Sequence, residues 1–116
     1  MNEIRRVEKP WGFEIWWAHT DQYAGKLLDV EQGQRLSLQY HQRKDESGYL
    51  LSGAVRLSKG PGIDQLVTTL MHPGDCWHTR PSERRICSTS GKSASIYTIR
   101  WRHRRKRSMM SMRDMC

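Results

Sequence analysis

The stretch Arg35-Leu36-Ser37-Leu38-Gln39-Tyr40-His41, followed five residues later by Glu46, is the most informative part of this chain. In a β-strand, side chains two residues apart share a face. One face of this stretch would then carry an arginine, a serine, a glutamine and a histidine, and the other would carry two leucines and a tyrosine. We therefore expect a strand that turns a polar face into a pocket inside a small β-barrel.

Three polar side chains of this region form our candidate metal site: Gln39, His41 and Glu46. They offer oxygen, nitrogen and oxygen donors, a set that suits a divalent metal such as Zn, Mn, Fe, Ni or Co. The alternative is that the same residues are ordinary polar groups in a closed-off pocket. The residues alone leave both interpretations open.

Short strand patterns separated by glycine and proline turns run through most of the chain. We expect strands at residues 12–19, 23–30, 35–41, 49–51, 54–57, 66–71, 75–79, 84–88 and 93–101. Residues 42–45 should form a loop that returns Glu46 to the pocket, and Gly53 should close a hairpin between 49–51 and 54–57. No convincing helix precedes residue 100. A chain of 116 residues with this pattern predicts one all-β domain, a sandwich or a barrel.

The spacing of these residues resembles the first motif of the cupin superfamily. Five residues match the positions of that motif, with glutamine in place of its usual first histidine: Gly33, Gln39, His41, Glu46 and Gly53. The string from Arg35 to His41 resembles the small, single-domain, mannose-6-phosphate isomerase-like (type II) cupins, in which glutamine is an accepted metal ligand. Two further segments resemble the same branch: Lys9-Pro10-Trp11-Gly12 and His72-Pro73-Gly74-Asp75.

This resemblance implies a cupin double-stranded β-helix, or jelly-roll barrel, over residues 1–101. It also implies metal-assisted aldose–ketose isomerisation of a sugar or sugar phosphate, in which the metal polarises the carbonyl group and stabilises an enediolate. The sequence does not identify the catalytic base of this reaction. The alternative function is a non-catalytic cupin with a degraded metal site that binds a sugar or a small anion.

The second cupin motif is altered in this chain. Such cupins have the sequence Pro-Pro-Gly-Thr-x-His-Arg, where this chain has Arg80-Pro81-Ser82-Glu83-Arg84-Arg85-Ile86. Arg85 thus stands at the position of the fourth ligand, a histidine, and a permanently protonated arginine cannot donate a lone pair to a metal. We therefore expect the divalent metal to be weakly bound or absent, with His78 as a candidate substitute ligand.

Arg85 itself has three interpretations. It points inward and forms a salt bridge with Glu46 in place of the metal, it points outward into solvent, or it binds the phosphate group of a substrate. Arg35, Lys44 and Lys26 are further candidate anion-binding residues, although each one alone is more often a solvated surface charge.

The tryptophans offer a second set of interpretations. Trp11, Trp16, Trp17 and Trp77 are each able to stack on a sugar ring, but such residues more often belong to a core or to a subunit interface. Because Trp16 and Trp17 are adjacent, they should face opposite sides of their strand, which places one of them outside the barrel interior. We therefore expect a partly buried interface and a homodimer.

Most of the net charge of +8 lies at the C-terminal end of the chain. Residues 100–116 hold seven basic side chains and one acidic side chain, whereas the rest of the chain is nearly neutral. We expect the basic, methionine-rich residues 102–116 to be either a disordered arm or an artefactual segment without function. The neutral barrel and the lack of a base-reading motif argue against a nucleic-acid partner.

The cysteines and the absence of targeting patterns bear on the cellular compartment of the protein. Three cysteines without a CxxC motif are typical of reduced thiols in a cytoplasmic protein. The sequence starts without a signal-peptide pattern, and no apolar stretch is long enough to span a bilayer. We expect a cytoplasmic protein whose partner is a small-molecule sugar or sugar phosphate, with no membrane partner.

Overall fold

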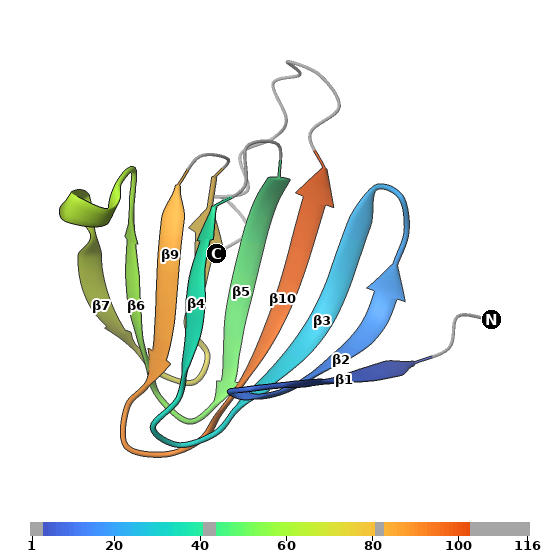
Figure 1. Ribbon diagram of the computed structural model, residues 1–116, viewed down its shortest axis with the longest axis horizontal. Coiled ribbons are helices and arrows are strands. Elements are labelled where there is room, and N and C mark those ends of the chain that lie inside the picture. Colours follow the sequence, from blue (N-terminus) through green and yellow to red (C-terminus); the bar gives the residue numbers. More distant parts are fainter. Residues whose placement is uncertain (1–3, 41–43, 81–82, 103–116) are drawn as a thin grey trace.

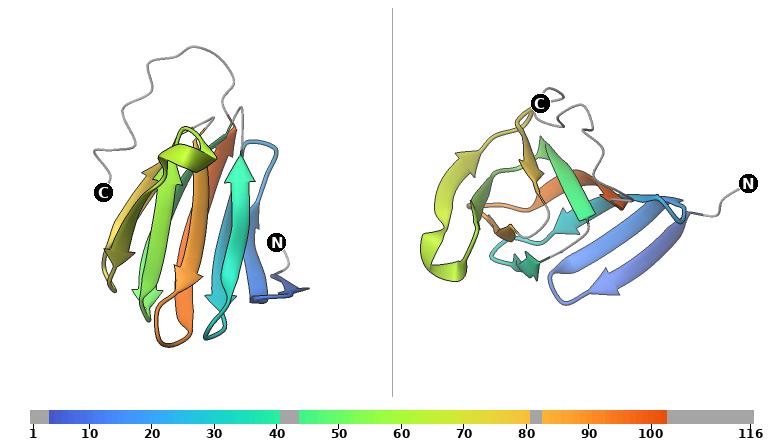
Figure 2. Two further views of the ribbon diagram at one scale, coloured as in Figure 1. Left: turned by 60° about the vertical axis from the view of Figure 1, so that its left-hand side comes forward. Right: turned by 90° about the horizontal axis from the view of Figure 1, so that it is seen from above.

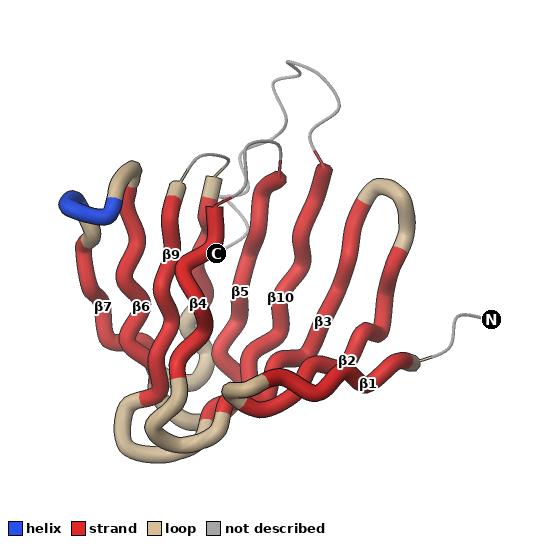
Figure 3. The backbone as a smooth tube through the Cα atoms, in the orientation of Figure 1, coloured by secondary structure: helices blue, strands red, loops and turns tan. Residues whose placement is uncertain are grey.

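The computed structural model describes residues 4–40, 44–80 and 83–102, and β-strands account for most of them (Figures 1 and 3). The ten strands are β1 (Arg5–Lys9), β2 (Gly12–His19), β3 (Tyr23–Val30), β4 (Arg35–Tyr40), β5 (Lys44–Ser52), β6 (Val55–Gly60), β7 (Val67–Met71), β8 (Cys76–Thr79), β9 (Arg84–Thr89) and β10 (Ala94–Arg102). The described residues also contain one short 3-10 turn, η1 (Ile63–Gln65), and no α-helix. The predicted all-β class is confirmed.

The strands form two antiparallel sheets that face each other (Figures 1 and 2). One sheet has six strands in the order β1-β2-β3-β10-β5-β8, and the other has four strands in the order β4-β9-β6-β7. Strands that are distant in the sequence lie side by side in both sheets, as β3 and β10 do. This arrangement is the expected jelly-roll barrel.

The core lies between the two sheets and is made by side chains from alternate positions of the strands. Its buried apolar members are Leu28, Val30, Leu36, Leu50, Val55, Leu57, Met71, Trp77, Cys87, Ala94 and Ile96. Leu50 and Ile96 are completely buried partners on neighbouring strands β5 and β10. The side chains that share their face of the six-stranded sheet therefore define the barrel interior.

The predicted strands at 12–19 and 23–30 have the observed bounds of β2 and β3. β1 was not predicted, because the sequence Arg5-Arg6-Val7-Glu8-Lys9 lacks an apolar face. This strand forms through backbone pairing with β2 at the edge of the sheet. Charged side chains are typical of edge strands, since they discourage pairing with other chains.

The predicted hairpin around Gly53 is wrong. β5 pairs with β10 and β8 in the larger sheet, whereas β6 pairs with β9 and β7 in the smaller one. Gly53 has a φ of 85° and carries the chain from one sheet to the other. A side chain at this position would also collide with the backbone carbonyl of Ser93, so the glycine serves a change of sheet and not a hairpin turn.

The predicted loop at 42–45 is also too long. β5 already begins at Lys44, so Lys44 and Asp45 belong to a strand and Glu46 is its third residue. At the other end of the chain, β10 extends to Arg102, and the prediction for residues 103–116 lies outside the described residues. Within the described ranges, no helix is long and apolar enough to cross a membrane.

Candidate functional site

One end of the barrel interior is charged, and β5 and β10 bring the charges there. Glu46 lies four residues before Leu50 and therefore on the same face of β5. Arg100 lies four residues after Ile96 on β10 and is the register partner of Glu46. The two strands that supply the most buried core residues thus also supply a buried carboxylate and a guanidinium.

Glu46 forms ion pairs with two arginines that come from different sheets. Nη2 of Arg85, on β9, lies 2.6 Å from Oε1 of Glu46, and Nη2 of Arg100, on β10, lies 2.9 Å from Oε2. Nε of Arg100 also donates to Oε2 at 3.3 Å. The side chains of Arg85 and Glu46 are only 3% and 4% exposed, so their pairing takes place in the interior.

This arrangement matches the first of the three interpretations of Arg85, an inward salt bridge with Glu46. Both oxygens of the carboxylate already accept from a guanidinium, and a divalent metal bound there would lie close to two permanent positive charges. Among the described residues, no group of three His, Cys, Asp or Glu side chains could hold a metal ion. The described residues therefore do not fit a metal at Glu46.

The other two predicted ligands are only partly described. The backbone of Gln39 pairs with Arg85 in β9. His41 and the side chain of Gln39 lie outside the described residues, as does the side chain of Lys44. The predicted convergence of Gln39, His41 and Glu46 stays a prediction.

His78 faces away from Glu46. In β8 it is the register partner of Ser47, while its neighbour Thr79 is the partner of Glu46. Its Nε2 lies 3.3 Å from Oδ1 of Asp45, and its Nδ1 lies 3.2 Å from the Ser47 hydroxyl. Burial lowers the pKa of His78, and the Asp45 carboxylate opposes that shift. In this structure, His78 is placed to bond with Asp45 and Ser47, not to join Glu46 around a metal.

The motif strand β4 breaks the alternation that the sequence suggested. Leu36 is buried in the core and pairs with Cys87, whereas Arg35 is exposed. Three steps along β4, from Leu36 to Gln39, correspond to two steps along β9, from Cys87 to Arg85. Such a β-bulge shifts the side-chain phase. The predicted inward polar face does not extend to Arg35, and its role as an anion-binding residue stays a prediction.

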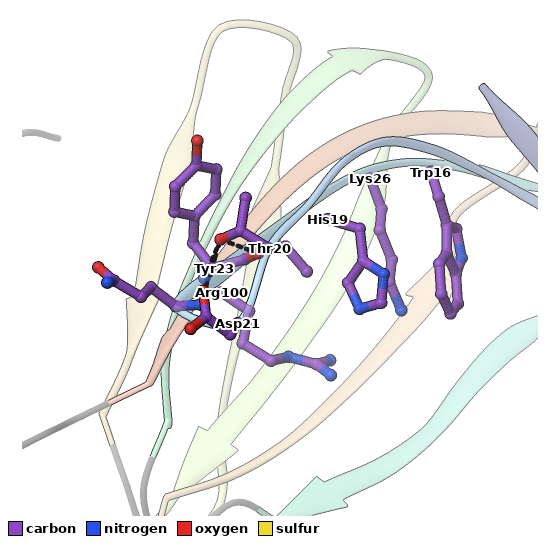
Figure 4. Close-up of a pocket in the computed structure, with 9 residues that line it drawn as sticks. Trp16, His19, Thr20, Asp21, Tyr23, Lys26 and Arg100 are labelled. Carbon is purple, nitrogen blue, oxygen red and sulfur yellow. Dashed lines mark hydrogen bonds between the residues drawn. The ribbon is translucent and has the colours of Figure 1, made fainter. Parts of the chain in front are cut away.

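A pocket of about 350 Å³ opens next to this ion-pair centre (Figure 4). Its lining comes from β2, β3, β10 and the loop between β2 and β3: Trp16, His19, Thr20, Asp21, Gln22, Tyr23, Ala24, Lys26 and Arg100. Lys26 is the register partner of Trp16 on β2 and of Thr98 on β10. It lies two residues before Leu28 on β3, and Thr98 lies two residues before Arg100 on β10. The pocket thus shares the inner face of the sheet.

A second β-bulge shapes this pocket. The register of β2 and β3 shifts between Trp16 and Ala18. As a result, Trp16 and His19 reach the same face, and their rings lie 5.2 Å apart in an edge-on contact. Trp17 instead covers Gly25 on the outer face, where its ring leaves no room for a Cβ atom. The adjacent tryptophans therefore face opposite sides, as predicted.

The charges at the pocket are linked to the tryptophan. Nζ of Lys26 lies 3.4 Å from Oε1 of Glu14 and 4.4 Å from the centre of the Trp16 ring. Trp16 Nε1 donates to the same carboxylate at 2.8 Å. Burial lowers the pKa of Lys26, Glu14 opposes that shift, and the nearby Arg100 lowers the pKa further. Lys26 and Arg100 therefore repel each other across a shared space.

The outer face of the six-stranded sheet has a different character. A groove of about 670 Å³ is lined mainly by aromatic and apolar residues there: Trp17, Ser47, Gly48, Tyr49, Gly74, Cys76, Tyr97, Ile99 and Trp101. Trp17 is 42% exposed. Sequence reasoning identified Trp17 but not its aromatic neighbours, which alternate along β5 and β10 with the buried residues.

Arg100 was missed as a site residue: it was counted only with the basic side chains of residues 100–116, although the predicted strand at 93–101 contains it. The alternation of Ile96, Thr98 and Arg100 along β10 is the signal that could have placed it inside the barrel. Lys26 was identified as a candidate anion-binding residue, and the structure places it in the pocket.

Comparison with known proteins relates the fold to solved structures only. No family model matches this sequence, and no curated protein matches it. The structure of KdgF from Halomonas sp. is similar with a TM-score of 0.72 and 16% identity, over 99% of this chain and 94% of that chain. An oxalate decarboxylase OxdC mutant from Bacillus subtilis gives a TM-score of 0.76 at 13% identity, over 91% of this chain and 29% of that chain.

The Cnp3 cupin domain of Schizosaccharomyces pombe is a third similar structure, with a TM-score of 0.66 and 10% identity over 77% of this chain and 64% of that chain. At such identities the likeness concerns the fold alone. Two facing antiparallel sheets and these structural neighbours establish that the chain has the cupin β-barrel fold.

Proposed function

We propose that this cupin-fold protein is a non-catalytic binder of small anionic carbohydrates, in which arginine has replaced the metal. The observation that supports this proposal is the double ion pair of Glu46 with Arg85 and Arg100. A guanidinium carries one positive charge and has no vacant coordination position, so it neither polarises a carbonyl as a Lewis acid nor generates a bound hydroxide.

The balance of charge in the interior favours an anionic ligand. Besides the two arginines, Lys26 lines the pocket, and Lys59 extends inward to donate to the backbone carbonyl of His78 at 2.6 Å. Two interior carboxylates, Glu14 and Glu46, face these cations. The described part of the interior therefore has an excess of positive charge, which attracts sugar phosphates and sugar acids.

The test is a titration of the full chain with mannose 6-phosphate, glucuronate and unmodified mannose, followed by calorimetry in the presence and absence of EDTA. We expect the two anionic sugars to bind with the same affinity in both conditions, and more tightly than mannose. Binding that disappears with EDTA and returns with Zn²⁺ or Mn²⁺ would contradict the proposal.

The metal part of the proposal has its own test. Arg85→His restores the residue type that the cupin motif has at this position, so metal content after purification without a metal-binding tag should rise above that of the wild type. Lys92→His is the control, because Lys92 lies in an exposed turn. A wild-type protein that already carries one metal per chain would overturn the proposal.

Metal-assisted isomerisation depends on Gln39 and His41 and stays a prediction. We also propose a homodimer in which the outer aromatic face, with Trp17 and Tyr97 exposed, is covered by a second copy. Sedimentation equilibrium tests this, since Trp17→Glu should yield monomers if the face is the interface.

A further inference from the structure

The pocket beside the ion-pair centre is divided into two chemically different ends. Side chains from the strands, namely His19, Lys26 and Arg100, form one end and point toward one another (Figure 4). The other end is formed by Thr20, Asp21 and Gln22 of the loop between β2 and β3 and by Tyr23, the first residue of β3. This division matters because each end selects a different chemical group.

The strand end suits an anion. Lys26 and Arg100 come from β3 and β10, which lie side by side, and the presence of Arg100 disfavours the charged form of Lys26. A negative group between them would relieve this repulsion and form charge-assisted hydrogen bonds, which are stronger than neutral ones. Lys26 is held in place by Glu14 and the Trp16 ring, so its position is set before a ligand arrives.

The loop end suits hydroxyl groups. Its carboxylate and amide accept and donate hydrogen bonds, and none of its side chains is a cation. The loop is itself ordered by Thr20, whose hydroxyl accepts from the backbone N–H groups of Gln22 and Tyr23 at 3.1 and 3.0 Å. A second anionic group at this end would be repelled by Asp21.

We infer that this pocket binds a monosaccharide with a single anionic group, with the phosphate or carboxylate between Lys26 and Arg100 and the hydroxyl groups against the β2–β3 loop. The pocket volume of about 350 Å³ is at the small end of ligand sites, which agrees with one sugar unit. This inference rests on the proposed function and adds the location and the orientation of the ligand.

The first test measures binding to variants at Lys26. Lys26→Met removes the cation but keeps most of the aliphatic stem, and the affinity for mannose 6-phosphate should fall by about tenfold or more. Lys26→Arg keeps the charge and should restore most of the affinity. Lys92→Met removes one positive charge from an exposed turn and should change the affinity by less than about twofold, since exposed charges act weakly through solvent.

The second test locates the ligand without any variant. On titration of the wild-type chain, the indole N–H resonance of Trp16 should shift, while that of Trp77, buried in the core beside Gly48, should not. Mannose 6-phosphate, glucuronate and inorganic phosphate are titrated separately, which distinguishes a phosphate from a carboxylate and a sugar from a bare anion.

The outcomes separate the two proposals. If the wild type binds anionic sugars but Lys26→Met binds them equally well and the Trp16 resonance does not move, the pocket assignment is overturned and the proposed function stands. If inorganic phosphate binds as tightly as mannose 6-phosphate, the loop end does not recognise hydroxyl groups and the sugar assignment is overturned. If the wild type binds none of the ligands, both proposals fail.

Discussion

One end of the barrel interior is filled by aliphatic side chains, whereas the other holds arginines, lysines and carboxylates, and the same strands build both. β10 contributes Ile96 to the apolar end and Arg100 to the charged end, and β5 likewise contributes Leu50 and Glu46. The difference shows that scaffold and site are divided along each strand, not between strands. The apolar end stabilises the fold by burial, and the charged end retains buried ions that hydrophobic residues could replace.

The largest expected effect is at the charged end. Glu46→Gln removes the negative charge between two guanidiniums and should lower the free energy of unfolding by about 3–5 kcal/mol, because buried charge is left uncompensated. Urea denaturation measures this loss. Glu8→Gln is the matched control: it breaks an exposed pair with Arg6 and should produce little measurable change. Equal losses in both variants would mean that the Glu46 ion pairs contribute no more than a surface pair.

At the apolar end, Ile96→Ala should lower the free energy of unfolding by about 2–5 kcal/mol, because Ile96 is completely buried and its truncation leaves a cavity. Unlike the change at Glu46, it should leave the affinity for anionic sugars unchanged while the protein remains folded. Val67→Ala, at an exposed position, should change stability by no more than about 0.5 kcal/mol. Loss of sugar binding in folded Ile96→Ala would show that the two ends are coupled.

A double-mutant cycle sharpens the comparison further. Glu46→Gln and Arg85→Gln, alone and combined, should give an interaction energy of about 0.5–3 kcal/mol, because the two side chains are in direct contact in the interior. Thermal or urea unfolding of the four proteins provides the values. Additive effects would indicate that the wild-type contact adds nothing beyond the separate cost of each change.

The smallest effect concerns Cys87, which lies two residues from Arg85 at the border between the two ends. Burial raises the pKa of the Cys87 thiol to about 11, although Arg85 opposes the shift. The folded protein should therefore resist alkylation at Cys87 at pH 8, while half-buried Cys76 reacts faster. Peptide mapping after timed labelling tests this, and equal rates at both cysteines would contradict it.

The sequence predicted the elements that obey simple alternation. β2 and β3 alternate regularly enough, between clear turns, for their bounds to be correct. The sequence also identified Arg85, because an arginine stands at the position of a metal ligand, and Lys26, because a sugar phosphate needs a cation to bind it.

The remaining features depend on pairing between distant strands. The register of β4 shifts after Leu36, a bulge in β2 brings His19 to the face of Trp16, and neither irregularity has a local sequence signal. Arg100 was missed for a related reason. Its partner Glu46 is 54 residues away, so only the register of β5 and β10 reveals the ion pair.

The change of sheet at Gly53 has a consequence for how this chain reaches its native state. Because β5 and β6 do not form a hairpin, both partners of β5, β8 and β10, come later in the sequence. One of the two partners of β6, β9, is also distant in the sequence. The loops closed by these pairings are long, and forming them costs chain entropy before their contacts are made. Proteins with such distant pairings fold slowly, over milliseconds to seconds. We therefore expect both edges of β5 to stay unpaired during synthesis until β8 and β10 have been made.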